Sequence, residues 1–310
     1  MSVGIAILNL NGQSQLEVLL PILIREDIKK RILVVDSSST DNSSKVVESL
    51  PDVEWLQIPR SEFNHGATRE LARQYLKTDI VVFLTQDVIP LAGFLKHLIK
   101  PIQDGSCAVT YARQLPHVNA GFFESFPRHY NYPEHSNQRT INDANRLGVF
   151  TFFCSDSCAA YSNAALDEIG GINPILTNED YFTVAKLLTN GFSIAYTAES
   201  QVHHSHKYRL VEEFQRYFDT GYVRGENQWV NKLVGQAENR GVGFLSTMLK
   251  ELFRKSPHLL PYALLQSATK WIGYRIGYLG PKLPLSLCKL LSSQGYYWNS
   301  RYCARNNRSN

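Results

Sequence analysis

The stretch RILVVDSSSTDNS, residues 31–43, places a short apolar run directly before a loop of serines, threonine and aspartates. Its first five residues predict a strand buried on both faces, because such strands are continuously apolar rather than alternating. Two runs of the same kind, VGIAIL at 3–8 and DIVVFL at 79–84, also stop at polar residues. With a further strand expected at 53–58, the pattern predicts a sheet whose strands end in polar loops.

Helix-like stretches separate these strands. One runs to about Arg25, a second is expected over 44–50 with Thr40 or Asp41 as its N-cap, and a third carries Ala67, Leu71 and Tyr75 on one apolar face. Strands separated by helices of this length imply right-handed parallel crossovers. The sequence therefore predicts an α/β fold with a doubly wound, mostly parallel sheet.

Polar clusters that carry Asn11, Asp36 and Asp87 follow the first, second and fourth strands. Ligands bind at the carboxyl ends of strands in such sheets, so these side chains should converge on one edge. The loop NLNGQS at 9–14 lacks the Gly-x-Gly-x-x-Gly pattern and no P-loop occurs, which argues against a dehydrogenase or a P-loop enzyme. A carboxylate at Asp36 could accept bonds from a base or ribose, and one at Asp87 could hold a divalent cation against phosphates. Together they fit an enzyme that handles a nucleoside diphosphate conjugate.

Composition limits the remaining classes. The chain has 310 residues, 44% hydrophobic and 19% charged, which is typical of a globular protein with room for more than one unit. Its net charge of +4 suggests no nucleic-acid partner. The start MSVGIAILNLNG has no charged leader, and no stretch approaches the ~18 apolar residues of a spanning helix. Five scattered cysteines indicate reduced thiols in a cytosolic protein.

Four segments in order resemble family 2 glycosyltransferases, the inverting GT-A enzymes that use nucleotide-diphospho-sugars. They are LNLNG at 8–12, VVDSSSTDNS at 34–43, TQD at 85–87 and NED at 178–180. The resemblance covers roughly residues 3–206. It implies a GT-A catalytic domain over residues 1–206, followed by a helical C-terminal region over 207–310.

Two further segments resemble bacterial rhamnosyltransferases, which take L-rhamnose from dTDP-rhamnose for O-antigen, capsule or cell-wall polysaccharide. They are EFNHGATR at 62–69 and LTQDVIP at 84–90. Donors of another kind, such as a UDP-hexose, and a nucleotide-sugar-binding protein without catalysis are the alternatives.

The resemblance also implies which residues contact the donor. Asp36 would accept a hydrogen bond from the pyrimidine N3–H, and the helix that begins near Gly66 would face the diphosphate, because helix N-termini attract anions. The whole set expected at the nucleotide sugar is Asn9, Asn11, Asp36, Ser38, His65, Gly66, Arg69, Gln86 and Asp156. Plainer interpretations are a turn residue at Asp36, a capped helix with an exposed arginine at Arg69, and a buried structural hydrogen bond at Asp156.

Metal ligands are implied at Asp87 and His204, with His206 second among the nearby histidines. Imidazole and carboxylate groups with phosphate oxygens can hold Mg²⁺ or Mn²⁺. The triplet Thr85-Gln86-Asp87 lacks the first acid of the family's Asp-x-Asp motif, which leaves the strength of metal dependence open. A strand-end aspartate and surface histidines are the alternatives.

Inverting transfer needs one general base on the acceptor hydroxyl and neutralisation of the leaving phosphates. The resemblance assigns the base to Asp180, with Glu179 supporting it. The alternative is that Asn178 caps a helix ending near Gly191, whose first turn favours acids. The segment 148–160, GVFTFFCSDSCAA, resembles the family's next strand, where acceptor and donor sugar meet.

The C-terminal third differs in charge from the rest. From Gly241 onward ten basic side chains accompany one acid, Glu251, which leaves residues 1–240 net negative. Residues 207–240 suggest a helix on the acceptor side, and the basic amphipathic stretches after Phe244 indicate helices in a membrane interface, with Trp271 at headgroup level. A helical subdomain packed on the catalytic core is the alternative. We therefore expect a peripheral protein on the inner face of the cytoplasmic membrane, acting on a polyprenyl-diphosphate-linked glycan acceptor.

Overall fold

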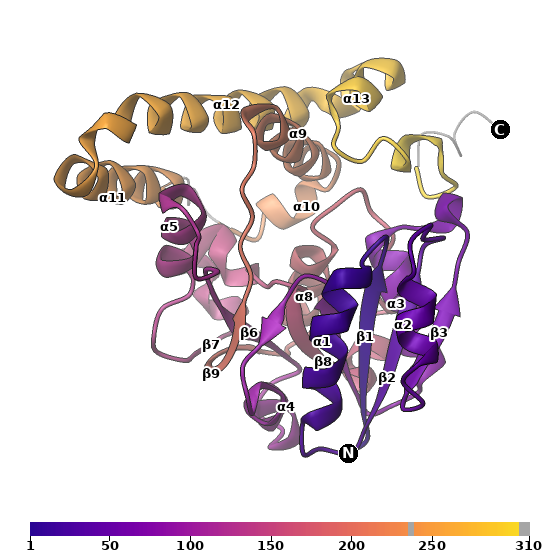
Figure 1. The fold of residues 1–310 in the computed structure, drawn as a ribbon. Coiled ribbons are helices and arrows are strands. Elements are labelled where there is room, and N and C mark those ends of the chain that lie inside the picture. The colour runs from indigo at the N-terminus through magenta and orange to yellow at the C-terminus, as the bar shows by residue number, and fades with distance from the viewer. Residues whose placement is uncertain (235–238, 304–310) are drawn as a thin grey trace. The chain divides into compact units, whose positions relative to one another are not determined.

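Nine strands form one sheet within residues 1–234 and 239–303, the part of the chain that the computed structural model describes (Figure 1). They are β1 (Val3–Asn9), β2 (Lys30–Asp36), β3 (Val53–Gln57), β4 (Ile80–Thr85), β5 (Ile89–Pro90), β6 (Val109–Leu115), β7 (Asn137–Arg139), β8 (Cys158–Ser162) and β9 (Ile194–His203). The order is β3-β2-β1-β4-β8-β6-β9-β5, and β7 pairs with β9.

The N-terminal half of the sheet is parallel. β1 pairs in parallel with β2 and β4, and β2 pairs in parallel with β3. β8 runs antiparallel between β4 and β6, whereas β6 and β9 are parallel to each other. The predicted α/β fold with a mostly parallel sheet is therefore confirmed.

Helices cover both faces of the parallel strands. Val3, Ile5 and Ile7 of β1 share one buried cluster with the leucines of α1 (Gln13–Arg25) and α4 (Phe94–Gln103). On the other face Gly4 lies against Leu76 of α3 (His65–Leu76). This alternation follows from the two-residue period of a strand, and it makes β1 a fully buried central strand. The remaining helices around the sheet are α2 (Ser43–Glu48), α5 (Phe122–Asn131), α7 (Asn163–Glu168) and α8 (Glu179–Thr189).

The buried face of α3 differs from the prediction. Leu71 and Tyr75 are 40% and 41% exposed, while Arg69 and Arg73 are buried. Both arginines pair with carboxylates, which compensates the cost of removing their charge from water. The apolar-face prediction was wrong because these ion pairs decide which side of the helix faces inward.

Three local predictions also need correction. Most of the segment 148–160 is not a strand, because Gly148–Phe152 forms a 3₁₀ turn and β8 begins only at Cys158. Asn178 does not cap α8, since its φ is 61° and its buried Oδ1 has no hydrogen-bond partner. The N-cap of α2 is Asn42, although the Asp41 carboxylate accepts the Ser43 amide at 3.0 Å. The five cysteines are buried free thiols, as expected.

The described chain divides into two compact units. The first comprises Met1–Ile141, Phe152–Pro174 and Glu179–Ser205, and the second comprises Asn142–Thr151, Ile175–Asn178 and the residues from His206 onward. The second unit contains α6 (Ala144–Leu147), α9 (Leu210–Glu226), α10 (Gln228–Asn231), α11 (Asn239–Lys255), α12 (Leu260–Leu279) and α13 (Leu285–Leu291). The helices expected after residue 207 are thus present, although two of the ten basic residues noted above, Arg305 and Arg308, lie outside the described range.

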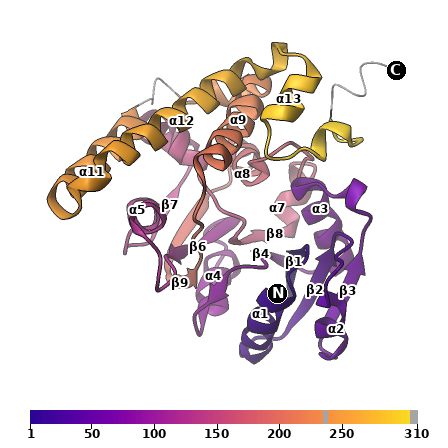
Figure 2. The same ribbon diagram turned by 45° about the horizontal axis from the view of Figure 1, so that its top comes forward.

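Within the second unit α9 and α12 lie side by side at unusually short range (Figure 2). Four glycines make this possible, because a Cβ at Gly277 would lie 2.0 Å from the Phe218 carbonyl oxygen and one at Gly221 would lie 2.2 Å from the Tyr274 oxygen. Gly225 and Gly273 make equivalent approaches. Pairs of glycines four residues apart are the packing device of helices that approach backbone to backbone.

Candidate functional site

The carboxyl ends of β1, β2 and β4 meet as predicted. The Asn9 side-chain amide donates to Asp36 Oδ1 at 2.8 Å. Gln86, which follows β4, accepts the Leu10 amide at 2.9 Å and donates to the Leu10 carbonyl oxygen at 3.2 Å. One edge of the sheet therefore gathers the loops that carry Asn11, Asp36 and Asp87.

Asp36 is wholly buried in this edge. Its carboxylate accepts hydrogen bonds from Asn9, from the Ser39 amide at 2.9 Å and from the Ser39 hydroxyl. The side chain thus fixes the shape of the loop that follows β2. Its contact with a pyrimidine stays a prediction, and the bound loop would have to expose the carboxylate for that contact.

Two residues of the same edge have left-handed backbones. Asn11 and Ser38 have φ values of 49° and 64°. Asn11 Oδ1 accepts the Thr40 amide at 2.8 Å, and the Ser38 hydroxyl donates to the Ile58 carbonyl oxygen at 2.9 Å. Such backbones persist where surrounding bonds over-determine them, which is frequent at ligand sites.

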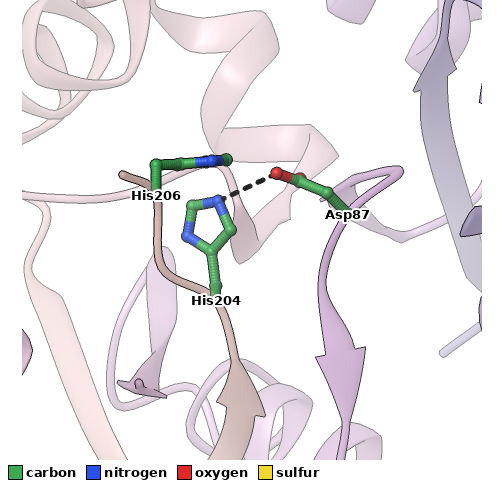
Figure 3. A group of neighbouring side chains, drawn as sticks. All are labelled: Asp87, His204 and His206. Carbon is green, nitrogen blue, oxygen red and sulfur yellow. Dashed lines mark ion pairs between the residues drawn. The ribbon is translucent and has the colours of Figure 1, made fainter. Parts of the chain in front are cut away.

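Beside this edge lies a candidate metal constellation, a group of side chains that could together hold a metal ion. Asp87, His204 and His206 each offer one ligand atom, and these atoms lie within 4.8 Å of one another (Figure 3). The dashed line drawn there joins His204 Nε2 to an Asp87 carboxylate oxygen at 3.5 Å, a contact that is an ion pair only when the imidazole is protonated. His203 is not a member of this group, and its Nδ1 lies 2.7 Å from the Pro116 carbonyl oxygen. The structure thus brings together Asp87 and His204, the two ligands predicted from the sequence.

The tautomer of His204 suits a metal ligand. Its Nδ1 lies 2.9 Å from the Gln114 Oε1, and an amide oxygen can only accept, so Nδ1 carries the proton. Gln114 is itself oriented by donating to the Ser155 hydroxyl at 2.8 Å. Burial lowers the pKa of His204, although Asp87 opposes this effect. A neutral imidazole then turns its Nε2 lone pair toward the Asp87 carboxylate, and a cation between two such acceptors satisfies both. The donor set of carboxylate and imidazole fits Mn²⁺ or Mg²⁺ completed by phosphate oxygens.

A second cluster joins Arg69 to acids from two other segments. Arg69 Nε lies 3.1 Å from Asp156 Oδ2, and its Nη1 donates to Glu179. Asp156 also accepts the Tyr161 hydroxyl at 2.6 Å. Arg69 is only 3% exposed, so the arginine that we expected over the diphosphate is instead enclosed by carboxylates. Asp156 is likewise buried, which favours its structural interpretation over a sugar contact.

Asp180 is the partly exposed member of this cluster. One carboxylate oxygen accepts the Tyr181 amide at 2.7 Å, and the other lies 3.4 Å from the Asp156 amide. Burial of the carboxylate raises the pKa of Asp180 well above its usual range, and the charges of Asp156 and Glu179 add to the effect. A carboxylate whose pKa is raised in this way can act as a general base near neutral pH.

The N-terminus of α3 is capped and packed by other residues of the chain. Asn64 caps the helix, since its side chain accepts the Ala67 amide at 3.1 Å. A Cβ at Gly66 would lie 2.1 Å from the Asn173 carbonyl oxygen, so glycine is required here for close packing. His65 contacts the Phe63 ring edge-on, and burial lowers its pKa. This geometry does not favour the phosphate contact expected at Gly66 and His65, which stays a prediction.

The sequence did not identify Gln114, Ser39 or Tyr161, although each orients a candidate site residue. Gln114 and Tyr161 lie in strands whose pairing brings them near residues distant in the chain. No local signal distinguishes Gln114, because β6 also carries the polar residues Thr110 and Arg113.

The metal constellation predicts a loss of cation affinity on removal of one imidazole. His204→Ala should weaken Mn²⁺ binding by at least the ~10–100-fold that loss of a supporting residue costs, measured by calorimetry with a nucleoside diphosphate present. His203→Ala, with its imidazole on the Pro116 carbonyl, is the matched control and should bind normally. Equal affinity in the two variants would exclude His204 as a ligand.

Comparison with known proteins agrees with this geometry. The pattern of the family described as Glycosyl transferase family 2 matches residues 4–170. The chain is 36% identical over 273 residues to the O-antigen chain rhamnosyltransferase RfbN of Salmonella typhimurium, covering 87% of each chain. It is also 36% identical over 273 residues to WbaN of Salmonella anatum, another O-antigen chain rhamnosyltransferase, covering 87% of this chain and 86% of that one.

Solved structures support the fold. The mannosyltransferase PcManGT from Pyrobaculum calidifontis, in complex with GDP-Man and Mn²⁺, superposes with a TM-score of 0.61 at 17% identity, covering 91% of this chain and 88% of that chain. With the sheet order described above, this likeness identifies the GT-A fold. Since the family pattern spans more than half of the chain and close relatives match most of its length, the protein belongs to glycosyl transferase family 2.

Proposed function

We propose that this protein transfers L-rhamnose from dTDP-β-L-rhamnose, with inversion, to a lipid-linked glycan during synthesis of a bacterial surface polysaccharide such as O-antigen. Two relatives that match 87% of the chain carry the name O-antigen chain rhamnosyltransferase. The segments EFNHGATR and LTQDVIP support the same donor.

The observation that carries the proposal is the placement of Asp180. It is a partly exposed residue at the start of α8, and burial of its carboxylate raises its pKa, with two neighbouring buried acids adding to the effect. In an inverting transfer the acceptor oxygen attacks the anomeric carbon, its proton passes to Asp180, and the bond from that carbon to the diphosphate breaks. No covalent intermediate is needed, so a single base suffices.

Asp87 and His204 would assist departure of the nucleoside diphosphate. A divalent cation held there would neutralise charge that develops on the diphosphate as it departs. The Asp87 carboxylate lies directly after Gln86, whose bonds to Leu10 anchor it at the nucleotide edge of the sheet. Asn9, Asn11, Asp36 and Ser38 shape that edge, which is where we propose that the nucleotide binds.

Two other interpretations predict different results. The same machinery with a UDP-hexose donor would turn over that sugar and not dTDP-rhamnose. A nucleotide-sugar-binding protein without catalysis would bind a donor and release no nucleoside diphosphate. No separate observation favours either interpretation. The cluster of Arg69, Asp156 and Glu179 beside Asp180 argues for catalysis rather than for donor binding alone.

Asp180→Asn should lower the turnover of dTDP-rhamnose by ~10²–10⁴-fold, because the amide cannot accept the acceptor proton. The measurement is release of dTDP from a panel of nucleotide sugars, with Mn²⁺ and a lipid-linked glycan acceptor, alongside donor binding by thermal stabilisation. Donor binding should persist in the variant.

Asp52→Asn makes the same chemical change at an exposed turn and is the matched control. Full activity in Asp180→Asn would remove Asp180 as the base. Preference of the wild type for a different nucleotide sugar would overturn the rhamnose assignment.

We further propose that α12 rests on the surface of the membrane that holds the acceptor. Among the described residues, no helix is both long enough and apolar enough to cross a bilayer. The face of α12 opposite α9 is nevertheless apolar and exposed, through Leu264 (53%), Leu265 (53%), Trp271 (65%), Ile272 (44%) and Leu279 (54%). These positions recur about every seven residues, which is two helical turns, so they share one side of α12. The neighbouring helices carry basic residues, and the combination is the pattern of an interfacial helix near anionic lipid.

The double change Leu265→Glu with Trp271→Glu should abolish sedimentation with vesicles that contain phosphatidylglycerol, because it places two anions on that face. Val118→Glu, which changes a side chain 92% exposed in the other unit, is the control and should sediment like the wild type. Unchanged sedimentation of the double variant would contradict the proposed surface.

A further inference from the structure

Arg69 links three segments that are far apart in the sequence. It lies one turn into α3, and its guanidinium contacts Asp156 in the loop before β8 and Glu179 at the first residue of α8. A third bond runs from Nη1 to the His65 carbonyl oxygen at 3.3 Å. All three side chains are less than one-tenth exposed, so the interaction has little competition from water.

We propose that Arg69 is a positioning residue, which fixes Asp180 as the general base by tying the Asp156 loop and the first turn of α8 to α3. This inference rests on the proposed function and adds a role to a residue that the sequence had suggested for the diphosphate. The arginine does not touch the substrate and acts through its two carboxylate partners.

Both carboxylate partners of Arg69 belong to segments that adjoin or contact Asp180. Glu179 precedes it in the chain, so the ion pair with Arg69 sets the first turn of α8 on which Asp180 lies. Asp156 faces it from the other side, where its backbone amide lies 3.4 Å from Asp180 Oδ2. Displacement of either segment therefore moves the reacting oxygen, and small displacements of catalytic groups are costly in rate.

Neighbouring rings brace the same arrangement. The Arg69 guanidinium lies 5.8 Å from the centroid of Phe83 in β4, and that ring contacts Tyr161 of β8. The Tyr161 hydroxyl in turn donates a hydrogen bond to Asp156 at 2.6 Å. The arginine is thus held from the sheet side as well as by its acids, which limits the rotamers open to it.

Charge gives Arg69 a second effect on Asp180. The charged groups that face this carboxylate are Asp156, Glu179 and Arg69, with the titratable Tyr161, Tyr132 and Cys154 nearby. Arg69 is the cation of this set, and it lowers the pKa of Asp180 against burial and the two acids. The same balance leaves the pKa of Asp156 at about 6, raised by burial. Without Arg69, Asp180 would hold its proton to higher pH and would be a base over a narrower range.

Two rival roles predict other results. A direct contact with the donor diphosphate would raise the donor KM on substitution and leave the pH profile of kcat unchanged. A purely structural ion pair would lower the melting temperature and leave kcat and its pH profile unchanged in the folded protein.

The test compares Arg69→Met, Arg69→Lys and Asp180→Asn in the full chain, with donor KM, kcat from pH 5 to 9 and thermal unfolding as readouts. Arg69→Met should lower kcat about tenfold or more with donor KM changed by less than about threefold, and should shift the acid limb of kcat to higher pH. Arg69→Lys keeps the charge and should restore part of both effects.

Arg73→Lys is the control for loss of a buried guanidinium, because Arg73 lies on the same helix and pairs with Glu70 and Asp167 instead. It should keep the wild-type acid limb. Should Arg69→Met not fold, Tyr161→Phe removes one support of Asp156 while Arg69 remains, and it should lower kcat by a smaller factor with donor KM unchanged.

A wild-type acid limb in Arg69→Met would overturn the inference, as would a wild-type kcat in Tyr161→Phe or a rise in donor KM at constant kcat. Full activity in Asp180→Asn is a different outcome, and it would contradict the proposed function itself. An inactive Asp180→Asn, together with a wild-type acid limb in the Arg69 variants and a wild-type kcat in Tyr161→Phe, would overturn the positioning role alone.

Discussion

The contact of Arg69 with Asp156 and Glu179 is the constraint around which the site is built. A buried guanidinium without partners would cost several kcal/mol, so the fold must bring both carboxylates to it. Those acids come from the loop before β8 and from the start of α8, which are 87 and 110 positions from Arg69 along the chain. Because Asp180 is adjacent to one acid and faces the amide of the other, the interaction that stabilises the core also orients the proposed base.

The sheet supplies the remaining chemistry through its parallel half. Polar loops meet where β1, β2 and β4 end. The Asn9 side chain donates to Asp36, and Gln86 accepts the Leu10 amide, so these side chains connect neighbouring loops. Asp87 follows directly and faces His204 at the end of β9, whose tautomer Gln114 fixes. Asp36, Gln86 and His204 are thus each oriented by a second residue, an arrangement that reduces the reorganisation needed on binding.

Sequence patterns predicted the parallel strands and several candidate site residues. The predictions that failed did so for physical reasons. Short apolar runs fixed the parallel strands, because continuous hydrophobicity reports burial on both faces, and motif order identified Asp87, His204 and Asp180 as candidates. The exposed Leu71 and Tyr75 were misassigned because the buried face of α3 depends on ion pairs with distant acids. The sequence also shows no sign of the carboxylate partners of Arg69, because they are 87 and 110 residues away and no local signal reveals them.

The most direct test of this account is a ¹³C NMR titration of the Asp180 side-chain carboxyl in the full-length protein, with Asp180→Asn to assign the signal. The account predicts a midpoint well above the ~3.9 of an unperturbed aspartate, and a further rise in Arg69→Met. A midpoint near that of free aspartate, or one that Arg69→Met leaves unchanged, would contradict the claim that this buried arginine and its two acids set the proposed base.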